Sequence, residues 1–499
     1  MTAFEAIRAE PLALANSYVH LPRGCYARVN PTPVAQPQLL RLNRALAERL
    51  GLDPGALETA AGVAVLAGNR VPDGAEPVAL AYAGHQFDNW VPSLGDGRAV
   101  LLGEVVDRDG IRRDLQLKGA GLTPFSRQGD GRASLGPVIR EYLVSEGMAG
   151  LGISTTRALA MVASGEPVVR EGLEPGGVLT RVAASHVRVG TFEYFFRRGD
   201  QDTVRALADY VIERHYPEIA GAERPYQALV EAVSVRTADL IADWLLVGFI
   251  HGVMNTDNVS LAGETLDYGP CAFMDAYHPA TVYSSIDVRG RYAYDQQPRI
   301  AHWNLARFAE TLLPMLAEDQ NAAIETAREA LDAFQHRFEV RYHAGLRRKL
   351  GLSEEQQGDV DLALDLLRRM AEQDADFTLT FRRLAELGRE CGEADGVVRE
   401  LFTDPSAFDA WAVTWRERLA AEASDDAARR EAMRAVNPTY IPRNHRIQQA
   451  IDAAEAGDLQ PIEELMTVLA DPYADHPELA DYARPPRPDE VIGRTFCGT

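Results

Sequence analysis

The spacing of the apolar residues changes partway along the 499-residue chain, and this change most restricts the folds open to it. From about residue 78 to 200, short runs of β type alternate with glycine-rich turns, and one helical segment, 138–151, lies among them. From 202 to 252, and again from 303 to about 470, apolar residues recur at helical spacing. Strands first and helices second predict an α+β protein with two lobes.

Particular strands and helices are expected within these stretches. The strand candidates are the runs 78–82, 99–106, 114–118 and 177–182. Leucines recur every three or four residues from 38 to 50, which predicts a helix there. The most apolar run, 240–250, contains Asp243 and is too short to span a bilayer, which favours a buried helix. The acidic, proline-rich last 30 residues are expected to be irregular.

The composition is that of a globular protein with an excess of acid. Apolar residues make up 46% of the chain and charged residues 25%, which excludes a disordered tail protein, a collagen and a coiled-coil rod. The net charge of −22 argues against non-specific binding to nucleic acid and against an anionic membrane surface. Glu5 and Glu10 lie where a signal or transit peptide would be apolar or basic, so we expect a cytoplasmic protein.

A glycine-rich turn precedes the expected strand at 99–106. Gly95 and Gly97 flank an aspartate, and Arg98 follows them. Such a turn lets backbone N–H groups approach phosphate oxygens, and an arginine adds positive charge. Taken alone, the pattern is more typical of an ordinary hairpin turn.

Lys118 ends the next expected strand, on the same face as Gln116. A strand lysine after a glycine turn, followed by a glutamate on a helix, is the arrangement found in protein kinases. The helix at 138–151 offers Glu141 and Glu146, which do not share one face, so only one of them should pair with Lys118. The alternative is a lysine on the solvated face of a sheet.

The strongest local motif runs from His251 to Asn258 and is followed by Asp267-Tyr-Gly. In a kinase catalytic loop the metal-binding asparagine lies seven residues after the histidine, and a D-F-G motif follows. The catalytic aspartate of that loop is replaced here by Val253, which cannot accept a proton. Either the chain is an inactive kinase or another base serves, and Asp257 is the candidate. The order of all these features along the chain favours this interpretation over chance.

Long stretches of the chain resemble the selenoprotein O (SelO) family of pseudokinases, called YdiU proteins in bacteria. The matching stretches lie between about residues 80 and 305, and the flanks agree in length and character. They are YAGHQFD (82–88), LGDGR (94–98), QLKGAG (116–121), TPFSRQGDGR (123–132), TRVAASHVR (180–188), MNTDN (254–258), DYGP (267–270) and GRYAYDQQP (290–298).

The resemblance implies a protein-kinase-like two-lobed fold with a largely helical C-terminal half. It implies a protein adenylyltransferase, which moves AMP from ATP to Ser, Thr or Tyr hydroxyls of proteins and releases pyrophosphate, with the ATP flipped relative to kinases. The expected partners are therefore ATP and protein substrates, without nucleic acid or membrane. The expected parts are an N-terminal extension (1–75), an N-lobe-like, nucleotide-binding β-rich part (76–200), the catalytic core of the C-lobe (201–300) and a helical part with an irregular tail (301–499).

Site roles follow from the same resemblance, position by position. Asp257 would accept the proton, and Asn258 and Asp267 would hold Mg²⁺, with Mn²⁺ as the alternative. Glu141 would be the helix partner of Lys118. The residues that would bind the nucleotide are Gly95, Gly97, Arg98, Lys118, Asp130, Gly131, Arg181, Arg188 and Asp267.

Two features of this assignment need more than a straight strand. Arg181 and Arg188 are seven residues apart and would face opposite sides of one strand, so a bulge or turn near Ala184 is required for a shared pocket. The alternative is a pair of surface arginines. Many family members carry a cysteine or selenocysteine near the C-terminus, where this chain has Cys497. A regulatory disulfide between Cys497 and Cys271 is one expectation, and a buried Cys271 with a free tail thiol is the other.

Other functions remain open at this point. A transferase of the same class could prefer UTP and transfer UMP, because base choice is not visible in the sequence. An ordinary phosphotransferase is disfavoured by Val253. A non-catalytic nucleotide-binding scaffold is disfavoured because Lys118, Asn258 and Asp267 are all present.

Overall fold

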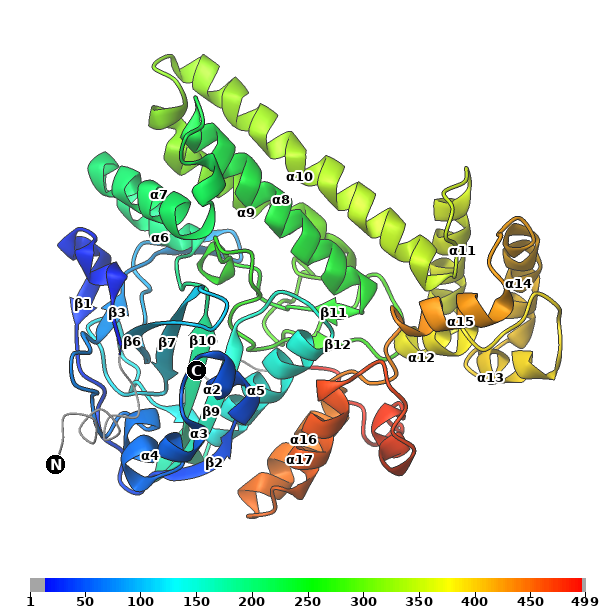
Figure 1. The fold of residues 1–499 in the computed structure, drawn as a ribbon, viewed down its shortest axis with the longest axis horizontal. Helices are drawn as coiled ribbons and strands as arrows, with labels where there is room; N and C mark the ends of the chain where they lie inside the picture. The colour runs from blue at the N-terminus through cyan, green and yellow to red at the C-terminus, as the bar shows by residue number, and fades with distance from the viewer. Residues whose placement is uncertain (1–13, 496–499) are drawn as a thin grey trace.

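The computed structural model describes residues 14–495, and this part of the chain contains an antiparallel sheet of eight strands (Figure 1). The strand order is β1-β3-β6-β7-β10-β9-β2, with β8 paired to β10 outside that path. The strands are β1 (Tyr26–Arg28), β2 (Gln38–Leu42), β3 (Val78–Leu80), β6 (Ala99–Val106), β7 (Arg112–Lys118), β8 (Ala133–Ser134), β9 (Arg157–Val169) and β10 (Leu173–Ala183).

The two faces of this sheet are covered by different helices. Alternate residues of a strand point to opposite faces. In β10, Val178 and Val182 belong to one hydrophobic cluster with three short helices, whereas Leu179 belongs to the cluster that contains a long helix. The short helices are α2 (Arg44–Arg49), α3 (Pro54–Leu57) and α4 (Ala60–Leu66), and the long one is α5 (Leu135–Gly150).

Two small sheets lie beside the large one. The hairpin of β4 (Gly84–Gln86) and β5 (Asn89–Val91) contacts α6. The pair β11 (Phe249–Ile250) and β12 (Ala272–Phe273) follows α8.

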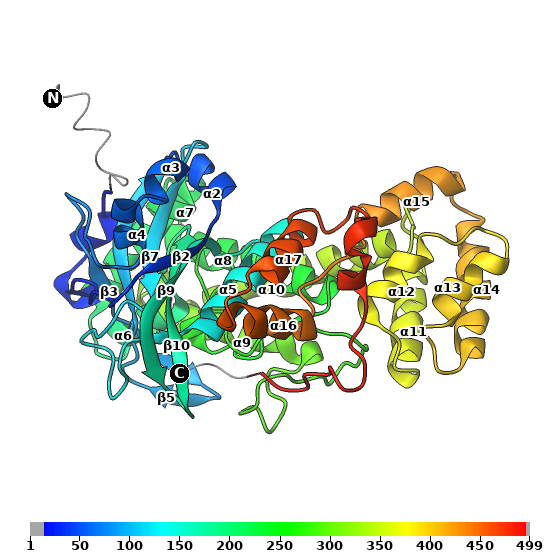
Figure 2. The same cartoon turned by 90° about the horizontal axis from the view of Figure 1, so that it is seen from below.

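Helices dominate the rest of the molecule. They are α6 (Val189–Phe196), α7 (Gln201–His215), α8 (Pro225–Leu246), α9 (Gln297–Leu316), α10 (Gln320–Lys349), α11 (Asp359–Glu372), α12 (Phe377–Leu384), α13 (Gly396–Arg399), α14 (Pro405–Leu419), α15 (Asp426–Arg434), α16 (Asn444–Glu455) and α17 (Gln460–Ala470). Helices α8, α9 and α10 pack together, and α11 to α15 form the end of the molecule farthest from the sheet (Figure 1). The chain then returns, and α16 and α17 pack on α5 (Figure 2).

The α+β class and the helical C-terminal half are confirmed, and the helix expected at 138–151 is α5. The helix expected over 38–50 is wrong in its first half. Residues 38–42 form β2, which pairs with β9, and α2 begins only after Asn43. The Asn43 side chain accepts a hydrogen bond from the backbone N–H of Leu46, and this cap fixes the start of the helix. Leucine spacing alone did not separate the two elements.

The structure also bears on the expectations for residues 240–250 and for the C-terminal tail. The buried helix expected over 240–250 ends at Leu246, and the last two residues of that run, Phe249 and Ile250, form β11. The tail is irregular up to Thr495 apart from a 3₁₀ segment, Pro477–Ala483. Within residues 14–495, no helix is long and apolar enough to cross a membrane. The kinase-like fold and the four-part division remain predictions.

Buried Lys349 gives the helical half a testable pH dependence. Lys349 ends α10, is 3% exposed, and its Nζ lies 4.4 Å from the ring centroid of Phe381. Burial lowers its pKa to about 7, against about 10.4 in an unfolded chain. The unfolded state therefore binds more protons between these values, and stability rises with pH across that window.

Replacing Lys349 by methionine is expected to remove this penalty. The variant should gain about 4 kcal/mol of unfolding free energy near neutral pH, and the gain should shrink as the pH approaches roughly 10. Urea unfolding of both proteins across this range measures the difference. A gain that does not depend on pH would mean that the pKa of Lys349 is not lowered in the folded protein.

Candidate functional site

Lys118 lies at the end of β7, facing α5. In β7, Leu115 and Leu117 point to the side of the short helices, so Gln116 and Lys118 point to the other. The Lys118 Nζ lies 2.5 Å from Glu141 Oε2 and 3.1 Å from Asp267 Oδ1. The other helix glutamate, Glu146, instead pairs with Arg157 at 2.6 Å.

Two arginines from the next stretch of chain reach the same carboxylates. Arg181 Nη2 lies 2.7 Å from Glu141 Oε1 and 2.6 Å from Asp267 Oδ1. Arg188 Nη1 lies 3.3 Å from Asp267 Oδ2. The chain turns between them, because β10 ends at Ala183 and α6 begins at Val189. Both arginines are 2% exposed, so the alternative of two surface arginines is wrong.

The Asp267 carboxylate is therefore enclosed by three cations. Arg181 first, then Lys118 and Arg188, offset the cost of its burial and hold its pKa well below the ordinary value. The carboxylate in turn raises the pKa of the Arg181 guanidinium. Asp267 adopts a left-handed backbone conformation with φ of 64°, which is uncommon for a residue other than glycine. Such a strained backbone is characteristic of functional sites.

The glycine turn packs against a second loop, residues 119–132, which follows β7. Gly95 has φ of +68°, and a Cβ there would lie 2.3 Å from the Phe125 ring, so the position requires glycine. Ser126 Oγ donates to the Gly97 carbonyl at 2.5 Å. The Arg98 carbonyl, just before β6, accepts from the N–H of Gly119 at 2.7 Å. The backbones of the two loops are therefore held together at the end of the sheet where Lys118 lies.

The two remaining loop candidates differ from each other. Gly131 is buried, has φ of +72°, and packs so closely on Gly121 that a Cβ would lie 2.2 Å from its backbone. Asp130 is exposed, and its carboxylate pairs with Arg170 at 2.9 Å. Asp130 thus ties its loop to the turn between β9 and β10.

Asp257 lies in a short 3₁₀ turn, Thr256–Asn258, after β11. It is 7% exposed, and its Oδ2 accepts a hydrogen bond from Gln86 Nε2 at 3.1 Å. Its Oδ1 is buried without a hydrogen-bond partner among the described residues. Burial raises the pKa of the carboxyl to about 6. A Cβ on Gly84 would lie 2.5 Å from this Oδ1, so only glycine leaves the oxygen its space.

Arg188 joins the two carboxylate-bearing loops. Its Nη1, which faces Asp267, also donates to the backbone carbonyl of Asp257 at 3.0 Å. Asn258 follows directly and donates its Nδ2 to the Val253 carbonyl at 3.0 Å, which leaves its amide oxygen as an acceptor. Arg188 thus links the Asp257 turn to Asp267, and Asn258 is the next residue of that turn.

The comparison with known proteins decides the family. The family model described as "Protein adenylyltransferase SelO" matches residues 10–470. The chain belongs to the SelO family. It is 62% identical over 493 residues to the "Protein nucleotidyltransferase YdiU" of Alkalilimnicola ehrlichii, covering 98% of this chain and 100% of that protein. It is 63% identical over 486 residues to the protein of that name from a Bradyrhizobium species, covering 97% and 98%. As a SelO member, the chain is a nucleotidyltransferase.

The donor set of this SelO chain fits a hard divalent cation. Asp267 offers a carboxylate that is 23% exposed, and Asn258 offers an amide oxygen. Mg²⁺ is bound in many nucleotide sites by one or two such oxygens together with substrate phosphates. Within the part of the chain that the structure describes, no three His, Cys, Asp or Glu side chains form a metal cluster, so a closed all-protein site is absent.

Sequence reasoning missed several SelO residues that hold the site. Asp96, between the two turn glycines, is buried and accepts hydrogen bonds from Leu80 N–H and Gln116 Nε2. His85 Nδ1 lies 2.6 Å from Glu193 Oε1. The β4–β5 hairpin carries His85 and Gln86 onto the Asp257 turn, a contact between segments about 170 residues apart that no local spacing reveals.

The cysteine expectations are tested only in part. Cys271 is buried, and burial raises the pKa of its thiol to about 12, so it is not a thiolate at neutral pH. Cys497 lies outside the described residues.

Proposed function

We propose that this chain transfers AMP from ATP to hydroxyl groups of protein substrates and releases pyrophosphate. The observation that carries this proposal is the Asp267 carboxylate held among Lys118, Arg181 and Arg188, next to Asp257. Phosphate groups need cations that are already in place, and two of these cations are rigid, buried guanidinium groups. That the transferred group is AMP and that the acceptor is a protein rests on the family description, protein adenylyltransferase.

In this mechanism Asp257 receives the proton of the substrate hydroxyl. Its Oδ1 has no partner among the described residues, and its pKa of about 6 leaves it ionised at neutral pH but close enough to accept a proton. The hydroxyl oxygen forms a bond to the α-phosphorus, and the bond from that phosphorus to the oxygen that bridges to the β-phosphate breaks. The electron pair leaves with pyrophosphate.

The other side chains bind and orient the reactants. Arg181, Arg188 and Lys118 bind phosphate oxygens, and the glycine turn supplies backbone N–H groups. Asn258 and Asp267 would hold Mg²⁺ or Mn²⁺, which supplies neutralisation of phosphate charge. Glu141 positions Lys118 and Arg181 through its two oxygens.

Two alternatives are weaker. γ-Phosphoryl transfer by a kinase needs a base at position 253, where the side chain is valine. A non-catalytic scaffold is disfavoured by membership in a family of nucleotidyltransferases.

UMP transfer from UTP remains the second candidate, because the name of the relatives, protein nucleotidyltransferase, does not say which nucleotide is transferred. A kinase-like two-lobed arrangement belongs to the same proposal and is supported by the order of Gly95, Lys118, Glu141, Asn258 and Asp267 along the chain.

Asp257→Asn tests the assignment of the base. The variant keeps the size of the side chain but cannot accept the proton, so AMP transfer should fall by roughly 10²- to 10⁴-fold. Affinity for ATP should change little, because Asp257 carries no phosphate-binding cation. The protein and a protein substrate would be incubated with ATP or with UTP, each with Mg²⁺ or Mn²⁺. Intact-mass spectrometry of both proteins then gives the rate of transfer and the identity of the transferred nucleotide.

Two results would contradict the assignment. Full transfer by Asp257→Asn would exclude Asp257 as the base. A mass increase with UTP alone would replace adenylyl transfer by uridylyl transfer. The matched control is Asp365→Asn on α11, whose carboxylate pairs with surface arginines and should leave transfer unchanged.

A further inference from the structure

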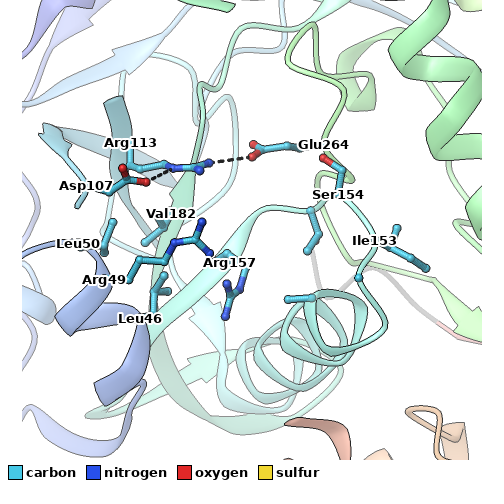
Figure 3. Close-up of a pocket in the computed structure, with 13 residues that line it drawn as sticks. Leu46, Arg49, Leu50, Asp107, Arg113, Ile153, Ser154, Arg157, Val182 and Glu264 are labelled. Carbon is cyan, nitrogen blue, oxygen red and sulfur yellow. Dashed lines mark hydrogen bonds and ion pairs between the residues drawn. The ribbon is translucent and has the colours of Figure 1, made fainter. Parts of the chain in front are cut away.

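A cavity of about 330 Å³ lies beside Asp107, where β6 ends, at the opposite end of that strand from the glycine turn, and Figure 3 shows the residues that line it. It is bounded by α2, by Asp107 after β6, by Arg113 near the start of β7, by Arg157 at the start of β9, by Val182 near the end of β10, and by the end of α5. This volume lies within the range of small-ligand sites. Its lining residues are Leu46, Arg49, Leu50, Asp107, Arg113, Ala149, Gly152, Ile153, Ser154, Thr155, Arg157, Val182 and Glu264.

Three arginines of the wall each have an unused donor. Arg113 donates from Nε to Asp107 and from Nη1 to Glu264, which leaves Nη2. Arg157 uses Nε and Nη2 on Glu146, and Arg49 uses Nε and Nη2 on Asp109, which leaves Nη1 of each. None of these three nitrogens has a protein acceptor among residues 14–495. Since guanidinium groups donate and never accept, the wall suits a ligand rich in acceptors.

The rest of the wall supports the same chemistry. Burial raises the pKa of Glu264 to about 7, so this carboxyl carries less than a full negative charge at neutral pH. It therefore repels an anion less than an ordinary glutamate would. Leu46, Leu50, Ile153 and Val182 add apolar surface to the lining among the arginines, which favours an organic ligand over a bare inorganic ion (Figure 3).

The floor of the cavity continues into the Asp267 segment. Residues 154–156 and 264–266 run side by side: Thr265 N–H donates to the Ser154 carbonyl, and Thr156 N–H donates to the Thr265 carbonyl, each at 3.0 Å. The Thr155 hydroxyl is hydrogen-bonded to the Tyr268 hydroxyl. A ligand that contacts Thr155 is thus connected to Asp267 through the hydrogen bond to Tyr268, the next residue in the chain. A ligand that contacts Glu264 is connected to the strained Asp267 backbone through residues 265 and 266.

We propose that this cavity is a second binding site, for a small organic anion carrying a phosphate or carboxylate group, and that its occupant alters nucleotide binding through residues 264–268. The binding follows from the cavity alone, whereas the effect on nucleotide binding rests on the function proposed above. By linkage, the two ligands change each other's affinity by the same factor.

Isothermal titration with citrate and with inorganic phosphate tests the binding. Ser154→Phe places a large side chain at the exposed cavity mouth without removing an ion pair, and it should abolish binding of both probes. Arg49→Gln should weaken binding roughly tenfold, because it removes one charged donor from the wall. Arg328→Gln, which removes a comparably exposed arginine on α10, is the matched control and should bind as the wild type does.

Lys118→Ala separates this site from the nucleotide site. Binding that persists in Lys118→Ala and disappears in Ser154→Phe supports the proposal. Binding that disappears in Lys118→Ala but persists in Ser154→Phe, or the absence of saturable binding of either probe, overturns it. With the cavity saturated by citrate, the affinity for ATP with Mg²⁺ should change at least about fivefold. An unchanged affinity overturns the coupling, while the proposed activity is judged separately by the mass assay above.

Discussion

Replacing Asp267 by asparagine is expected to lower nucleotidyl transfer by roughly 10³-fold or more. The substitution keeps the shape of the side chain but removes the charge that Lys118, Arg181 and Arg188 surround. It would also replace the only carboxylate proposed to hold the metal by a neutral amide. Among the contacts described above, Glu141 alone would then offset the charges of Lys118 and Arg181, and the positions of the phosphate ligands would no longer be fixed.

Steady-state kinetics together with ATP titration would test the Asp267→Asn expectation. Loss of the cation should lower kcat and weaken binding of ATP with Mg²⁺ together, because both depend on the same carboxylate. Asp365→Asn provides the control for a lost carboxylate elsewhere. An Asp267→Asn protein that retains transfer within a few-fold of the wild type would remove Asp267 from the proposed site.

The second large effect concerns stability. Arg181 is buried and donates to Glu141, Asp267 and Gln116. Replacing it by methionine fills most of the volume but leaves the buried Glu141 carboxylate with Lys118 alone. Breaking a buried ion pair from one side costs about 3–5 kcal/mol, and we expect Arg181→Met to lose a stability of this order.

Chemical unfolding of Arg181→Met would measure this loss. The double variant Arg181→Met with Glu141→Gln should recover part of it, because the uncompensated charge is then gone. Arg368→Met on the exposed face of α11 removes a solvated ion pair and should change stability by less than about 1 kcal/mol. Equal losses in Arg181→Met and Arg368→Met would show that the buried network does not stabilise the fold.

The sequence predicted the parts of the site that are joined by order and spacing. Lys118, Glu141, Asn258 and Asp267 were selected because kinase-type sites present them in one sequence order, and the structure brings Lys118, Glu141 and Asp267 into contact. The turn between Arg181 and Arg188 was inferred from strand geometry, and the chain does turn there. These inferences used the order of residues along the chain and the alternation of side chains on a strand, both of which the sequence contains.

Long-range packing was not accessible in the same way. The leucines of 38–50 fit a helix, yet the first five residues pair with β9, a strand more than 100 residues away. The contact of Gln86 with Asp257 depends on how the β4–β5 hairpin is placed, and the cavity depends on side chains from several separate segments. Such features are set by tertiary contacts, for which residue spacing gives no signal.

The destination of the phosphate label tests the central claim most directly. The protein would be incubated with a protein substrate and ATP labelled either at the α-phosphate or at the γ-phosphate, beside Asp267→Asn. We expect the α-label on protein, the γ-label in released pyrophosphate, and neither on protein in the variant. Transfer of the γ-label to protein would contradict adenylyl transfer and would make this chain a phosphotransferase without a base at Val253.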